Sequence, residues 1–172
     1  DSVYVSGNDN VTNCNFANNF ASSDGAAVFF NVDGNISNCN FTNNKATYDG
    51  GAVRFFTSGN VTNCNFINNS ASHYGGAIRM ESGNVTNCNF ENNKVTGDRV
   101  YGGAIYIDSG TVTNCNFTNN SAYRGGAIYT DSGTVTNCYV ADNYASDDGG
   151  GVYVYANDNN GFVENCTFVN NR

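Results

Sequence analysis

Residues 58–80 read S-G-N-V-T-N-C-N-F-I-N-N-S-A-S-H-Y-G-G-A-I-R-M, and near-copies of this stretch fill the chain of 172 residues. The seven cysteines mark the copies, because they follow one another at intervals of 25, 25, 24, 27, 23 and 28 residues. A fixed period of roughly 20 to 50 residues is typical of solenoids and propellers. The repeat runs from end to end without a change of composition, so we expect a single domain over residues 1–172, part of a longer repeat protein or of a polymer.

One position of the repeat identifies the outward face of a strand. Side chains alternate between the two faces of a strand, and two copies carry arginine where others carry tyrosine or phenylalanine. Unpaired arginines are not found in a protein core. We therefore expect this position to face outward and to contribute little to the core. The outward column consists of Tyr4, Phe29, Arg54, Arg79, Tyr106, Tyr129 and Tyr153.

The inward positions follow from the same alternation. Valine or isoleucine flanks the outward column, and valine, cysteine and phenylalanine recur in V-T-N-C-N-F. Valine and cysteine are three residues apart, so we expect a bend at the asparagine before each cysteine, where a left-handed backbone is tolerated. We expect the cysteines to stack as free thiols without metal, since neighbouring strands lie roughly 4.8 Å apart and a disulfide needs Cβ atoms about 3.8 Å apart. An asparagine ladder is expected at Asn19, Asn44, Asn69, Asn93, Asn120, Asn143 and Asn171.

These columns predict an all-β fold, a right-handed parallel β-helix of about seven coils of 23–28 residues. Propeller blades need roughly 40 residues or more, and the leucine of leucine-rich repeats is absent. Crossover connections between parallel strands favour the right-handed form. The absence of proline agrees with a backbone in which nearly every N–H pairs with the next coil.

Two alternating motifs carry a family resemblance. G-G-A-I occurs at Gly75–Ile78, Gly102–Ile105 and Gly125–Ile128, and F-x-x-N at Phe41–Asn44 and Phe66–Asn69. The alternation resembles that of the chlamydial polymorphic outer membrane proteins and is similar to the repeats of adhesin-like surface proteins of gut and rumen methanogens. This resemblance implies a right-handed parallel β-helix at the cell surface, with an extracellular, adhesive role.

Composition removes several classes of partner. The net charge is −8 with only seven Lys and Arg residues, which argues against a nucleic-acid surface. The sequence has no apolar run of the length a membrane span requires, so we expect no membrane insertion by this segment.

The sequence offers little catalytic chemistry, and we expect no enzyme activity, no metal and no cofactor. Hydrolysis of polysaccharides needs an acid and a base at a controlled separation, whereas the acidic residues before the Gly-Gly corners look like solvated turn residues. A polysaccharide-degrading enzyme and weak calcium binding at these turns stay open as minor alternatives. Binding of ice or crystalline glycan by the threonine and asparagine columns, and glycosylation at the N-x-[ST] sequences, are weaker hypotheses.

The outward column is the predicted binding site. Tyrosine and arginine are favoured at binding hot spots, although stacking between coils could merely stabilise the sheet. Insertions in repeat proteins often form the binding face, and two coils carry them, at residues 96–101, which include Arg99 and Tyr101, and at residues 156–162. We expect attachment to a surface glycan or to a protein of a host or partner cell, through a patch centred on Tyr106, Tyr129 and Tyr153 whose removal leaves the fold intact. The alternative is a filament or stalk subunit that assembles head to tail.

Overall fold

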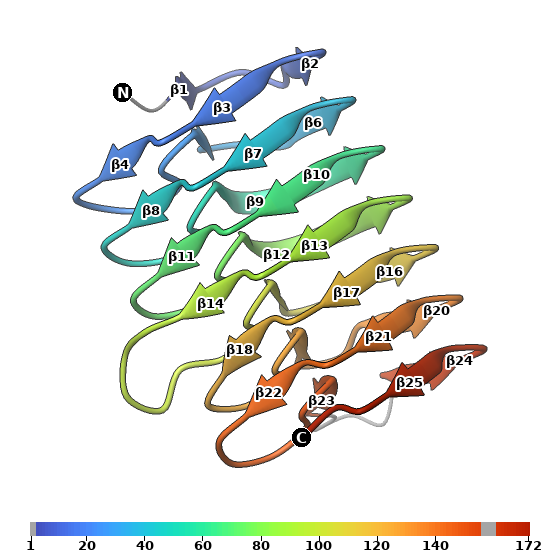
Figure 1. Ribbon diagram of the computed structural model, residues 1–172. Helices are drawn as coiled ribbons and strands as arrows, with labels where there is room; N and C mark the ends of the chain where they lie inside the picture. The colour runs from blue at the N-terminus through green and yellow to red at the C-terminus, as the bar shows by residue number, and fades with distance from the viewer. Residues whose placement is uncertain (1–2, 156–160) are drawn as a thin grey trace.

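The computed structural model describes residues 3–155 and 161–172, and it shows a parallel β-solenoid in which the chain winds through three sheets (Figure 1). The first arm of the largest sheet contains β1 (Val3–Val5), β5 (Val28–Phe30), β9 (Val53–Thr62), β12 (Ile78–Thr86), β15 (Ile105–Ile107), β19 (Ile128–Thr130) and β23 (Val152–Val154). Its second arm contains β2 (Asn10–Thr12), β6 (Gly34–Ser37), β16 (Thr111–Thr113), β20 (Thr134–Thr136) and β24 (Phe162–Glu164), together with the C-terminal parts of β9 and β12.

Two smaller sheets complete each turn. The second sheet contains β3 (Asn15–Ala17), β7 (Asn40–Thr42), β10 (Asn65–Ile67), β13 (Asn89–Glu91), β17 (Asn116–Thr118), β21 (Tyr139–Ala141) and β25 (Thr167–Val169). The third sheet contains β4 (Phe20–Ala21), β8 (Lys45–Ala46), β11 (Ser70–Ala71), β14 (Lys94–Val95), β18 (Ser121–Ala122) and β22 (Tyr144–Ala145). The described residues therefore complete six turns and begin a seventh, slightly fewer than the seven coils expected.

The strand register places equivalent residues of successive turns side by side. Phe66 of β10 pairs with Phe41 of β7 on one side and with Phe90 of β13 on the other, always in parallel. The rings of this column stack with centroids 4.7 to 4.8 Å apart between Phe41 and Phe117. The predicted inward columns of valine, isoleucine, cysteine and phenylalanine form one hydrophobic core, which confirms the reading of the repeat.

Asparagine makes two of the bends in each turn, except that Asp142 takes one of these positions. The residue before each cysteine has a left-handed backbone, for example Asn63 with φ of 55°, as predicted. A second left-handed residue precedes the ladder asparagine, for example Asn68 with φ of 57°. The predicted ladder is present: Asn44 Nδ2 donates to Asn69 Oδ1 at 3.0 Å, and Asn69 Nδ2 donates to Asn93 Oδ1 at 3.0 Å. These buried side chains supply the hydrogen bonds that a strand ladder lacks at a bend.

The cysteines occupy equivalent core positions and are free thiols. The backbone N–H of Cys39 points to Cys64 Sγ at 3.4 Å, and the Cys64 thiol donates to Thr62 O at 3.2 Å. Burial raises the pKa of the Cys39 thiol, as is usual for a small apolar core residue.

The Gly-Gly corner is a steric requirement. Gly75 has φ of +65°, which side-chain-bearing residues rarely adopt. A Cβ on Gly76 would overlap Gly103 O of the next turn. Among residues 3–155 and 161–172 no helix has the length and hydropathy of a membrane span.

Candidate functional site

The predicted binding column keeps one register along the first arm of the largest sheet. Tyr4 pairs with Phe29, Arg54 with Arg79, and Tyr129 with both Tyr106 and Tyr153. The residues on either side of the column, such as Val53 and Phe55 beside Arg54, belong to the hydrophobic core, so the alternation along the strand directs the column outward, as predicted.

The expected exposure of this column holds at Tyr4 and is wrong in the middle of the column. Arg54, Arg79 and Tyr129 are only 6%, 9% and 6% exposed, whereas Tyr4 at one end is 64% exposed. The middle of the column is therefore a second packed layer on the outside of the sheet. Its removal would disturb the fold, contrary to the expectation that the outer face contributes little.

The covering layer comes from the loops that connect the third sheet to the next Gly-Gly corner. Tyr74 lies 5.0 Å from the ring of Tyr106, and Tyr101 lies 4.7 Å from the ring of Tyr129. Tyr74 and Tyr101 stack on each other at 5.6 Å. The sequence signal for this layer is a tyrosine shortly before the Gly-Gly pair, as at Tyr74 and Tyr101. A comparison restricted to equivalent strand positions misses this signal.

An ion-pair network allows the two arginines to be buried. Arg54 Nη2 lies 2.7 Å from Glu81 Oε1, and Arg79 Nη2 lies 3.1 Å from both Glu81 Oε1 and Asp108 Oδ2. The Arg79 guanidinium also lies over the Tyr106 ring at 4.3 Å. Buried charges are tolerated when they are paired and hydrogen-bonded, and these are.

The two carboxyl groups of this network, those of Glu81 and Asp108, have widely separated pKa values. Burial and the hydrogen bond to Glu81 raise the pKa of Asp108 to about 7. Burial opposes ionisation of Glu81, but hydrogen bonds from Asp108 and Arg54 outweigh it and hold its pKa at about 2. Near pH 5 the pair therefore holds one proton, on Asp108, and loses it as the pH rises through about 7. Neither carboxyl was singled out from the sequence.

The loop tyrosines form a surface feature that we call the aromatic row, made of Tyr48, His73, Tyr74, Tyr101 and Tyr123. Adjacent rings lie 5.1, 6.3, 5.6 and 6.4 Å apart in that order. Tyr48 and His73 are exposed, and the other three are half-buried. The row passes along the loop corner over four successive turns.

The inserted loop at residues 96–101 extends past its neighbours after β14 (Figure 1). Val100 is buried and packs with Ala71 and Ala122 in a small cluster of its own. A groove with a volume of about 250 Å³ lies along this loop. It is lined by Val95, Thr96, Gly97, Asp98, Arg99, Ser121, Ala122, Tyr123, Tyr144 and Ser146.

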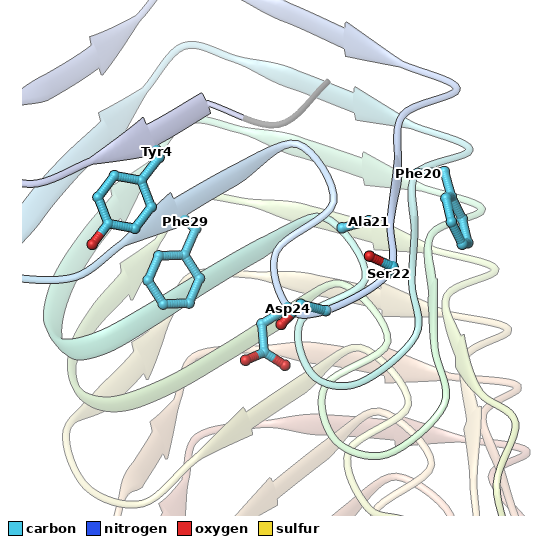
Figure 2. A pocket seen from close by; sticks show the side chains of 7 residues that line it. Tyr4, Phe20, Ala21, Ser22, Asp24 and Phe29 are labelled. Carbon is cyan, nitrogen blue, oxygen red and sulfur yellow. The ribbon is translucent and has the colours of Figure 1, made fainter.

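The first turns hold a separate pocket with a volume of about 410 Å³ (Figure 2). Tyr4 and Phe29 stack in parallel at 5.6 Å on one side. Phe20 lies across from them, and Asp24 lies near Phe29. This carboxylate is already engaged, because Asp24 Oδ1 accepts the backbone N–H of Asp49 at 2.9 Å.

The structure thus divides the predicted site residues among four places, one of which is the ion-pair network of Arg54 and Arg79 described above. Tyr101 joins Tyr106 and Tyr129 in one stack that continues to Tyr153. Arg99 lines the groove, and Tyr4 and Phe29 line the separate pocket. The second insertion falls largely on residues 156–160, which lie outside the described residues.

The acidic turn residues differ from one turn to the next. Asp49 is half-buried, and burial raises its pKa, whereas Asp147 and Asp148 are exposed and pair with Arg124 at 2.7 and 3.5 Å. In the part of the chain that the structure describes, no three His, Cys, Asp or Glu side chains converge as a metal site would require.

Comparison with known proteins agrees with this architecture. A family model described as right handed beta helix region matches residues 1–135 and residues 77–172, which together span the chain. Neither the curated proteins nor the solved structures gave a match. The chain belongs to the right-handed β-helix family.

Proposed function

We propose that this β-helix is a non-enzymatic, adhesin-like module that attaches a cell surface to a glycan or protein surface. The observation that carries the proposal is the aromatic row. Its rings lie outside the hydrophobic core and follow the loop corner, from exposed Tyr48 to half-buried Tyr123. Tyrosine supplies a large contact area together with a polar tip, which suits the recognition of sugars and protein surfaces.

The distribution of charge supports a binding role. The chain is acidic overall, and Arg54, Arg79 and Arg124 are occupied by ion pairs with carboxylates. Such a surface presents aromatic rings and oxygen acceptors, and it suits a neutral, hydroxyl-rich partner better than an anionic polymer.

The contacts of Glu81 and Asp108 favour a binding role over a catalytic role. Glu81 and Asp108 have the separated pKa values that acid and base catalysts show. Arg79 contacts both carboxyl groups, however, and Arg54 adds a second contact to Glu81. Structural ion-pair networks shift pKa values in the same way, so we assign the pair to stabilisation.

An extracellular location is part of the proposal. It is supported by the resemblance to adhesin-like surface proteins in the alternating G-G-A-I and F-x-x-N motifs. The aromatic row, which a repeat protein would need on its surface for attachment, is consistent with that location.

The proposal is tested with a glycan array probed with the fluorescently labelled chain. Binding to one group of related glycans is expected, and it should weaken in the variant Tyr48→Ala, whose side chain is half exposed and outside the core. Tyr139→Ala is the control, because Tyr139 is 44% exposed on the second sheet, away from the row. No binding to glycans, together with no binding to cell surfaces, would refute an adhesive role.

A filament or stalk unit is the second candidate function, and the direction of the asparagine ladder favours it. Asn19 Nδ2 donates to Asn44 Oδ1 at 2.8 Å, and Asn143 Nδ2 donates to Asn171 Oδ1 at 2.9 Å. A further turn at either end would continue the ladder, whether it belongs to the same polypeptide or to another copy. Electron microscopy of the chain tests this: unbranched filaments with a repeat of roughly 34 Å, for seven turns of about 4.8 Å, support assembly, and monomers at high concentration refute it.

A further inference from the structure

The groove along the inserted loop has rigid walls. Thr96 N donates to Ala71 O at 3.0 Å at the start of the loop, and Tyr123 N donates to Val100 O at 2.9 Å at its end. Val100 is buried against Ala71 and Ala122. Because the loop is held at both ends and by an apolar anchor, the groove is formed before any ligand binds, which lowers the entropic cost of binding.

Arg99 is the unusual residue of this loop. Its backbone is left-handed, with φ of 52°, whereas the other left-handed residues that carry a side chain are asparagine or aspartate. Residues other than glycine, asparagine and aspartate are uncommon in this region, and strained residues of this kind cluster at binding and catalytic sites. Arg99 is exposed and makes no ion pair or side-chain hydrogen bond among the described residues, although its charge, after that of Arg124, helps to lower the pKa of Asp147. Its donors are available to a ligand.

The opposite side of the groove offers an aromatic surface and hydroxyl groups. Tyr144 is 53% exposed, although it lies in β22 next to buried Ala145. Ser121 and Ser146 add hydroxyl groups, and Asp98 adds a carboxylate from the loop. The groove therefore combines one exposed ring, a fork of N–H donors and several oxygen acceptors.

These groups select a class of ligand. A pyranose has an apolar face that packs on a tyrosine ring, and its hydroxyl groups both donate and accept hydrogen bonds. They match the Arg99 donors and the Asp98 acceptor at the same time. A volume of about 250 Å³ is small for a pocket and suits one sugar ring. Arg99 would attract the carboxylate of an acidic sugar, but Asp98 in the same groove and the net charge of −8 oppose it, so a neutral sugar is the better match.

We propose that the groove between loop residues 96–100 and Tyr144 is a subsite for one neutral hexopyranose unit, with Tyr144 as the stacking platform and Arg99 as the hydrogen-bond donor. This proposal rests on the adhesive function proposed above, names its ligand class, and adds a subsite at Tyr123, where the aromatic row meets the groove. It also assigns a role to Tyr144, which the reading of the outward column did not include.

The test is saturation-transfer NMR of the chain with methyl glucoside, methyl galactoside, methyl mannoside and methyl glucuronide, followed by titration. One of the three neutral glycosides should bind, and Tyr144→Ala should weaken it at least tenfold. The matched control Tyr139→Ala, which removes a tyrosine of similar exposure (44% against 53%) in the same turn, should leave the affinity unchanged.

A second variant separates recognition from folding. Glycine suits the left-handed backbone at this position, so the variant Arg99→Gly should be at least as stable as wild type. Its affinity for the sugar should nevertheless fall at least tenfold. Binding of a glycan that neither Tyr144→Ala nor Arg99→Gly alters would overturn the subsite and leave the adhesive function standing. If methyl glucuronide binds and none of the three neutral glycosides does, the proposal that the ligand is a neutral sugar is refuted. No response from any glycoside, with no signal on the array, would overturn both the subsite and glycan attachment.

Discussion

Replacement of one ladder asparagine should cost far more than replacement of an asparagine four residues away. The Asn69 side chain is fully buried, and its Oδ1 accepts the backbone N–H and the Nδ2 of Asn44, both at 3.0 Å. Its own Nδ2 donates to Phe41 O and Asn93 Oδ1, both at 3.0 Å. The variant Asn69→Ala leaves the buried backbone N–H of Asn44 without a partner and removes one of the two acceptors of Asn44 Nδ2, which keeps its hydrogen bond to Phe16 O. An unpaired buried group costs about 1–3 kcal/mol and the other lost hydrogen bonds add to this cost, so we expect a loss of about 4 kcal/mol.

The control for this prediction is Asn65→Ala in the same turn. Asn65 donates to Asn40 Oδ1 at 2.8 Å, in a ladder that is exposed to solvent. Water replaces the lost partner, so the expected loss is about 0.5 kcal/mol or less. Urea denaturation followed by circular dichroism measures both variants, with m-values compared to detect partial unfolding of the solenoid. A loss for Asn69→Ala below about 1 kcal/mol, or equal to that of the control, would refute the ladder as a stabilising element.

Three further predictions concern other layers of the structure. Tyr129→Ala should lower the free energy of unfolding by about 3 kcal/mol, as for a buried aromatic residue; a loss below about 1 kcal/mol in urea denaturation would show that the outer layer is dispensable. Gly76→Ala should lower it by about 3 kcal/mol, because the new methyl group overlaps Gly103 O, and an unchanged melting temperature would contradict this. Asp108 holds its proton to a pKa of about 7 when folded, against an ordinary value of 3.8. Wild-type stability should therefore fall as the pH rises from 5 to 8, less so in Asp108→Asn, while the lowered pKa of Glu81 acts below this range; equal falls in both proteins would refute this assignment.

The repeat determined those parts of the fold in which every turn carries the same residue. The bend before Cys64, the Phe66 column and the Asn69 ladder were all predictable, because each depends on contacts between identical positions of adjacent turns. In a solenoid those contacts are set by register alone. A single departure, Val140 in the phenylalanine column, is accommodated because Val140 pairs with Phe117 and Phe168 in the same register.

The burial of the outer column was not predictable from the column itself. Two arginines in successive copies indicated exposure, and the inference failed because Glu81 and Asp108 neutralise them from a different position of the repeat. The covering rings of Tyr74 and Tyr101 come from loops whose lengths vary between turns. A comparison of equivalent positions in the repeat reveals contacts between those positions. It misses contacts between different positions of the repeat.

The core consists of equivalent positions that stack along the axis, whereas the candidate binding site lies in a loop that has no equivalent in the neighbouring turns. Identical positions stack on themselves along the axis, so a substitution in the Phe66 column disturbs the turns on both sides. The loop at residues 96–100 stacks on no equivalent loop and contacts its neighbours mainly through Val100 and its two ends. Its tip residues Asp98 and Arg99 can therefore vary without a cost to the ladders. In a repeat protein, residues can change without disturbing the strand register only in such loops. The groove beside Tyr144 is therefore a better candidate for specific recognition than the buried outward column.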